Sequence, residues 1–338
     1  MKKDFNLGYV FGLLRKTAPF LIFRFLIYMG IAVGIVLLIG LGSGMGYVVG
    51  SIADSGGGGA FFGGLMAFGL SVGILLFLRS YLLYMVKAGH IAVLVEVLEN
   101  RPLPEGKGQI EYAQKMVRER FKESNVLFAL DMLIKGILRA FNRTFLRISQ
   151  MIPIPGVEAA AKFLNTVINN SLGYLDEVIL AYLIKNRVEN PWAGGQTALI
   201  LYAQNYQTFL KNAVWLTLFI WALTFAVFLL ILAPIAGLVA LFPNLAGFAT
   251  LIFALVLAWG VKESLIEPFA MTALMTVYFK VTEGQTANPE WEEKLSSVSG
   301  KFREMGQKAK EWVNQPKSEP TPDAPPPPQI PEGPPPSA

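Results

Sequence analysis

Three charged residues interrupt the last long apolar run of the chain, within the stretch AWGVKESLIEPFAMT (258–272). They are Lys262, Glu263 and Glu267. The two acidic residues lie four positions apart, so on a helix they share one face and repel each other unless a proton or a cation lies between them. Ionisable residues inside a bilayer mark ion or substrate sites, whereas those at its edge act as anchors. These three residues are therefore the candidate transport or cation site.

The depth of Lys262 in the membrane decides between the two interpretations. A helix that enters the bilayer at Asn244 carries Lys262 about 27 Å along its axis, which is close to the ~30 Å thickness of the hydrocarbon layer. This placement favours charges at the inner interface that anchor the helix. The buried-site interpretation stays open if the helix is shifted inward, or if a break at Pro268 forms a re-entrant site.

The residue types that support most other chemistry are absent or nearly so. The chain has no cysteine and a single histidine, His90. Disulfides, thiolate zinc sites, cysteine nucleophiles and His-rich metal sites are thereby excluded. His90 stands in MVKAGHIAVL, with no nucleophile-elbow motif near it. We therefore expect no enzyme activity, no metal and no cofactor.

The elements that must position the three charges are membrane helices. Of 338 residues, 53% are hydrophobic and 16% charged, and the mean hydropathy is +0.47, outside the range of soluble domains. We predict an all-α, polytopic integral membrane protein with about four transmembrane helices. The predicted segments are an N-terminal interfacial helix (1–24), a Gly-rich transmembrane hairpin (25–87), cytoplasmic and interfacial amphipathic helices (88–212), and a second hairpin with a cytoplasmic extension (213–282).

Glycine spacing predicts how the first two spans pack. Three pairs repeat at small-xxx-small spacing, which lets helix backbones approach closely: Gly30 and Gly34, Gly46 and Gly50, and Gly69 and Gly73. We expect SIADSGGGG to form the loop between the two spans. The same glycine faces would allow a homo-oligomer.

Basic residues predict the orientation. The loops at 51–59 and 242–247 contain no lysine or arginine, while the N-terminal segment, 87–211 and the segment after 279 hold nearly all of them. The positive-inside rule then places both termini in the cytoplasm, with the chain in the plasma (inner) membrane.

A basic stripe runs through the middle segment at four-residue spacing, beside a broad aliphatic and aromatic face: Lys135, Arg139, Arg143 and Arg147. This pattern is typical of a helix in the headgroup layer of an anionic leaflet, so we expect it to bind membrane lipids. The alternative is a helix of a cytoplasmic domain whose arginines pair with acids. The breadth of the apolar face argues against nucleic acid.

The C-terminal part divides in two. Residues 283–315 predict an amphipathic helix that faces solvent, and residues 316–338, which contain PPPP and PPP, predict a disordered Pro-rich tail. The tail is either a ligand for a protein partner that reads polyproline or an inert solubilising segment.

Two functions are compatible with these features. The leading hypothesis is a non-enzymatic integral membrane protein that organises the membrane or recruits partners through its basic helix and Pro-rich tail. The alternative is an oligomeric small-solute or cation transporter or channel that uses Glu263 and Glu267. The stretches LILYAQNYQTFLKNA and EPFAMTALMTVYFK resemble parts of choline-transporter-like membrane proteins. The resemblance covers a small part of the chain, and no residue role is taken from it.

Overall fold

The fold is helical throughout the part of the chain that can be described. The computed structural model describes residues 4–78, 83–103, 108–120, 130, 133–134, 136–137, 166, 173–241 and 248–314. Its regular elements in these ranges are helices, and no strand occurs among them. The all-α prediction is confirmed for these residues. The predicted segment 316–338 lies outside them.

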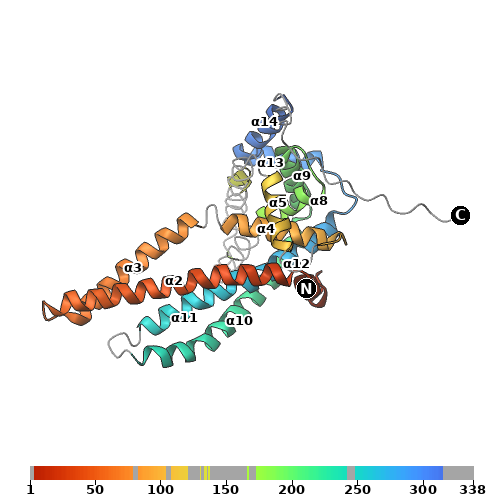
Figure 1. Ribbon diagram of the computed structural model, residues 1–338. Coiled ribbons are helices and arrows are strands. Elements are labelled where there is room, and N and C mark those ends of the chain that lie inside the picture. Colours follow the sequence, from red (N-terminus) through yellow and green to blue (C-terminus); the bar gives the residue numbers. More distant parts are fainter. Residues whose placement is uncertain are drawn as a thin grey trace, which may run out of the picture.

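Three helices are long and apolar enough to cross a bilayer: α2 (Ala18–Ser51), α3 (Gly56–Leu78, with Gly56–Leu75 as the candidate span) and α10 (Tyr206–Val239). The helices α2 and α10 have 34 residues each, about 51 Å of helix. Together with α11 (Phe248–Val261), they extend in the same direction from a helical body as two hairpins (Figure 1). A membrane protein is therefore indicated, with three of the four expected spans present by length and composition.

Glycines bring α2 and α3 into backbone contact. Gly46 of α2 lies against Gly59 of α3, and a Cβ built on Gly42 would lie 2.6 Å from the carbonyl oxygen of Gly63. A Cβ on Gly50 would lie 2.8 Å from the Cα atom of Gly59. Since real Cβ atoms do not approach other atoms this closely, the hairpin can close only because these positions are glycine.

The other predicted glycine pairs lie elsewhere on the two helices. A Cβ on Gly30, Gly34, Gly69 or Gly73 meets no described neighbour within 4 Å. The glycines at the hairpin contact also include Gly42 and Gly63, which no predicted pair contained. Which glycines are in contact depends on how the two helices face each other, and not on the spacing of glycines along one helix.

The loop between α2 and α3 is shorter than we expected. The chain turns over Ile52–Ser55, and Asp54 adopts a left-handed φ of 52°, which short polar residues tolerate better than most. The four glycines that follow form the first turn of α3 instead of a loop. Their helical geometry follows from the close approach to α2, which needs Gly59 on the contact face.

The helical body is built from segments on either side of each hairpin. Its helices are α1 (Leu7–Lys16), α4 (Tyr84–Leu98), α5 (Gly108–Arg120), α8 (Leu175–Lys185), α9 (Pro191–Gln204), α12 (Glu267–Thr282), α13 (Pro289–Val298) and α14 (Gly300–Asn314). One large cluster of buried apolar side chains joins most of them and also includes Phe209 and Leu216 of α10. The second hairpin therefore begins inside the core of the body.

Two helices with apolar residues on all sides form the centre of the body. In α4 every residue from Ala88 to Val97 is buried, and in α12 the same holds from Pro268 to Met275. Helices that are apolar all round are buried in a core or in a membrane. Here they are core helices: the Tyr278 hydroxyl of α12 donates to the carbonyl oxygen of Ala198 in α9 at 3.0 Å.

The C-terminal segment has one exposed face and one buried face. It forms two helices that meet at Ser299, whose backbone is extended. Phe302 and Met305 of α14 are fully buried in the main core. Asn190, which caps the N-terminus of α9, also donates from Nδ2 to the carbonyl oxygen of Ala309 at 2.8 Å. One face of α14 is thus bound to α9.

The glycine contact predicts opposite effects for the same substitution at two sites. Gly46→Ala forces a methyl group against the Gly59 carbonyl and should lower the free energy of unfolding by roughly 1–3 kcal/mol. Gly69→Ala meets open space among the described residues and should be neutral, or stabilising by up to about 1 kcal/mol through helix propensity. Denaturant unfolding in detergent micelles, followed by circular dichroism, measures both. Equal losses would contradict the contact.

Candidate functional site: a charge cluster at the base of the membrane helices

The charged residues of the last apolar run lie where α11 meets α12. Between them the chain forms a π-helical turn, Lys262–Ile266, in which the Glu267 N–H donates to the carbonyl oxygen of Lys262, five residues back. The next residue, Pro268, has no N–H. The carbonyl oxygen of Glu263 is therefore left without a backbone donor at this spacing.

Arg24 of α2 supplies the missing donors. Its Nε and Nη2 atoms donate to the Glu263 carbonyl oxygen at 3.1 and 2.8 Å. The Arg24 side chain is 1% exposed, and its guanidinium lies 5.4 Å from the ring centroid of Tyr28. A guanidinium buried this deeply is costly without hydrogen bonds, so these two bonds tie α2 to the π-helical turn.

The three charged side chains neutralise one another in part. The Lys262 ammonium pairs with the carboxylate of Glu263 at 3.2 Å and with that of Glu267. The side chains of Glu263 and Glu267 are 20% and 12% exposed. Lys262, which lies in the same turn, offsets the repulsion that the sequence predicts between the two carboxylates. With Arg24 beside them, the formal charges of the four residues cancel.

A second ion pair lies in the body. Lys87 of α4 donates to a Glu177 carboxylate oxygen of α8 at 2.8 Å, and the Glu177 side chain is 7% exposed. Burial opposes the charged form of Lys87, but the Glu177 carboxylate outweighs this together with further neighbours, so the pKa of Lys87 is raised. Loss of one partner would leave a buried charge uncompensated, which typically costs 3–5 kcal/mol.

Tyr174 connects the body to the cluster. Its side chain lies near enough to the Glu267 carboxylate to feel its charge. Burial, and then the negative charge of Glu267, raise the pKa of Tyr174. The Tyr174 hydroxyl therefore stays neutral at all ordinary pH values, beside a carboxylate that pairs with Lys262 of the π-helical turn.

His90, the single histidine, is a packed core residue. Its ring is fully buried, stacks on Phe20 at 5.2 Å between centroids, and has Nε2 3.3 Å from the Thr17 hydroxyl. Burial, and then the positive charge of Arg24, lower the pKa of His90 well below 6.5. The imidazole is thus neutral near pH 7.

The structure treats the predicted site residues differently. It brings Lys262, Glu263 and Glu267 together. The basic stripe, Lys135, Arg139, Arg143 and Arg147, lies outside the described residues. Among the described residues, no group of three or more His, Cys, Asp or Glu side chains could hold a metal ion.

Three charged residues of this region were not among the predicted site residues: Arg24, Lys87 and Glu177. Arg24 stands alone in an apolar run, and this isolation was the available signal. Lys87 and Glu177 carry no local signal, because they are 90 positions apart and meet only through packing of α4 on α8.

Comparison with known proteins gives no relative. No protein-family model, no curated protein and no solved structure matches the chain. No relative therefore assigns a role to the charge cluster.

The π-helical turn predicts a rescue. Arg24→Met leaves the Glu263 carbonyl without its donors and should cost roughly 1–3 kcal/mol of unfolding free energy. Pro268→Ala restores an N–H to the turn, so the double variant should recover part of this loss. A double-mutant cycle by denaturant unfolding should give a coupling energy of about 1 kcal/mol or more. The exposed Arg15→Met is the control, and strictly additive losses would argue against the mechanism.

His90 predicts a pH dependence that is easily isolated. Because its folded pKa lies below 6.5, its contribution to stability is present above pH 6.5 and is lost as the pH falls. Between pH 7.5 and 5.5 the loss should be about 1 kcal/mol. His90→Gln removes the titration and should flatten this part of the stability profile. An unchanged slope would show that carboxylates, which the variant keeps, cause the dependence.

Proposed function

We propose that the chain is a non-enzymatic integral membrane protein that holds its helical body at the inner face of the plasma (inner) membrane, where it organises the membrane or recruits partners. In this proposal the two hairpins are anchors and the charge cluster is the joint between anchor and body. The protein has no substrate of its own.

The state of the two carboxylates carries this proposal. A cation pathway needs acidic groups that are open to the ion, but Glu263 and Glu267 already pair with Lys262. A transported cation would have to displace a lysine that is tethered within the same turn. The geometry suits a fixed joint better than a binding site.

The continuity of the core supports an anchoring role. The side chains of Phe209, Leu216 and Ile220 of α10 belong to the main core of the body. So do those of Ile266, at the end of the π-helical turn, and Phe269 of α12. A helix that leaves a packed core without a linker transmits its orientation to the body. The body is then held in a defined pose relative to the membrane.

The proposal also includes a fourth span, an orientation in the membrane, and binding roles for the basic stripe and the Pro-rich tail. We place a fourth span at α11, whose 14 described residues give about 21 Å of helix. Both termini are cytoplasmic in this proposal. The basic stripe binds anionic headgroups, and the Pro-rich tail offers a docking segment to a protein partner.

Transport remains the second candidate because of one observation. A π-helical turn inside a helix is often found at functional sites, and this one carries Lys262 and Glu263. An oligomeric transporter would use the turn as a hinge that releases Lys262 from the acids.

Cation-dependent stability separates the two functions. The purified protein is melted at constant ionic strength in choline, sodium, potassium, magnesium or calcium chloride. A joint predicts the same melting temperature in all five, since no ion binds the folded state alone. A cation site predicts stabilisation by one ion that follows its concentration, as ligand linkage requires. In that case Glu267→Gln should abolish the shift.

Single introduced cysteines test the orientation, because the chain itself contains no cysteine. Ser55→Cys lies in the exposed α2–α3 turn and Lys310→Cys on the exposed face of α14. In sealed vesicles, an impermeant maleimide should modify residue 310 from the cytoplasmic side only and residue 55 from the opposite side only. Labelling of both from one side would overturn the proposed topology.

A further inference from the structure

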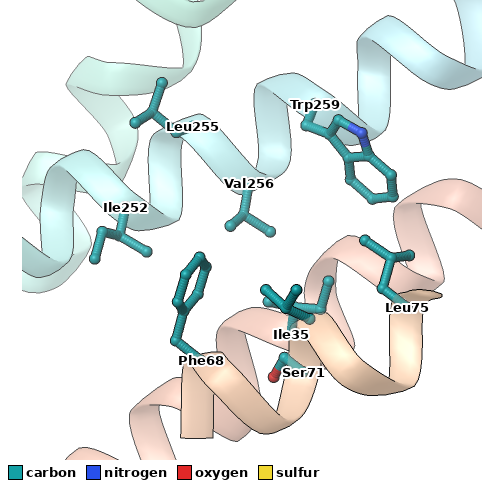
Figure 2. Close-up of a pocket in the computed structure, with 9 residues that line it drawn as sticks. Ile35, Phe68, Ser71, Leu75, Ile252, Leu255, Val256 and Trp259 are labelled. Carbon is teal, nitrogen blue, oxygen red and sulfur yellow. The ribbon is translucent and has the colours of Figure 1, made fainter. Parts of the chain in front are cut away.

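An apolar groove opens between the two hairpins. Its walls are α3, with Phe68 and Leu75, and α11, with Val256 and Trp259, and Ile35 of α2 forms its floor (Figure 2). The space amounts to about 280 Å³. A buried apolar cavity of roughly 150 Å³ holds a benzene molecule, so the groove has room for a hydrocarbon segment of roughly ten carbons.

The lining of the groove is apolar apart from two groups, the hydroxyl of Ser71 and the indole N–H of Trp259. Its one hydroxyl, that of Ser71, donates to the carbonyl oxygen of Ala67 in its own helix at 2.8 Å. The remaining lining consists of aliphatic and aromatic side chains. Water gains nothing in such a space, since an ordered water needs two or more polar partners. The apolar lining of the groove therefore favours a hydrocarbon ligand.

The surroundings of the groove supply hydrocarbon. It lies between α3, a candidate membrane span, and α11, over α2. Leu255, one of its lining residues, is 50% exposed, a degree of exposure that suits a lipid environment. The groove is too small for a helix of another copy, whose diameter is about 10 Å or more with side chains. A lipid acyl chain fits.

One end of the groove is polar. Trp259 contacts Tyr28, with ring centroids 6.1 Å apart, and Tyr28 lies under the guanidinium of Arg24. Lys262 follows Trp259 one helical turn later. Tryptophan residues of membrane proteins gather at the level of the headgroups. The groove therefore runs from this polar end toward Phe68 and Ile252, deeper among the apolar helices (Figure 2).

We propose that this groove is a binding site for one acyl chain of a bilayer phospholipid, with the ester end at Trp259 and the methyl end at Phe68 and Ile252. The lipid fills the wedge between the hairpins that protein side chains leave open. This inference rests on membrane insertion alone. It holds for an anchor as well as for a transporter, so its failure would leave the proposed function in place.

Photo-crosslinking of the full-length protein tests the proposal directly. The protein is placed in nanodiscs of phosphatidylethanolamine and phosphatidylglycerol that contain a trace of phosphatidylethanolamine with a diazirine in one acyl chain. After irradiation, peptide mass spectrometry locates the adducts. We expect Leu75, Val256 and Trp259 to be labelled several-fold more than Leu230, a 76% exposed residue of α10. Equal labelling would show ordinary lipid contact and overturn the site.

Two variants from opposite walls fill the groove. Val256→Trp and Leu75→Trp should each lower labelling of the remaining groove residues several-fold, while Leu230→Trp should leave it unchanged. Melting curves establish that each variant is folded, and the map of the unsubstituted protein stands even if one is not. Unchanged labelling in both folded variants would overturn the site, as would a crosslink between two copies of the chain through these residues.

Discussion

The hydrogen bonds from Arg24 to the carbonyl oxygen of Glu263 constrain how the membrane helices meet the body. A guanidinium cannot be buried in an apolar bundle without acceptors, and in a regular α-helix each carbonyl oxygen already accepts one backbone N–H. The π-helical turn and Pro268 together free one carbonyl at the required position. The register of α2 against the junction of α11 and α12 follows from this single acceptor.

Once α2 is fixed, the rest of the membrane sector follows from side-chain size. The glycines of α2 and α3 allow backbone contact and hold α3 along one side of α2. On another side, Tyr28 meets Trp259 of α11, and Gly260 faces Ala32. With α3 and α11 held on different sides of the same helix, a wedge remains between them. The apolar groove is that wedge, so it is a consequence of the packing and not of a locally shaped cavity.

Hydrophobic runs and turn residues predict where the helices of this fold lie. They predict less well which helices pack together. The run lengths predicted α2 and α10, and the dipeptide Asn190-Pro191 marks the start of α9. The depth of Lys262 predicted a position at the inner interface of the membrane. The burial of α14 and the Lys87–Glu177 pair could not be predicted, since both depend on contacts between distant segments. The glycine spacing predicted close packing but could not select the glycines that face another helix.

The charge balance explains how such a cluster can lie beneath an apolar bundle. Each basic group has an acidic or carbonyl partner that cannot leave, because the partner belongs to the same turn or to a packed helix. Pairs of this kind stabilise little when intact, but the removal of one member exposes the full desolvation cost of the other. We therefore expect these pairs to favour the native arrangement of α2, α4, α8 and α11. An arrangement fixed in this way favours a rigid joint and disfavours an ion path, which would need one of these partners to exchange.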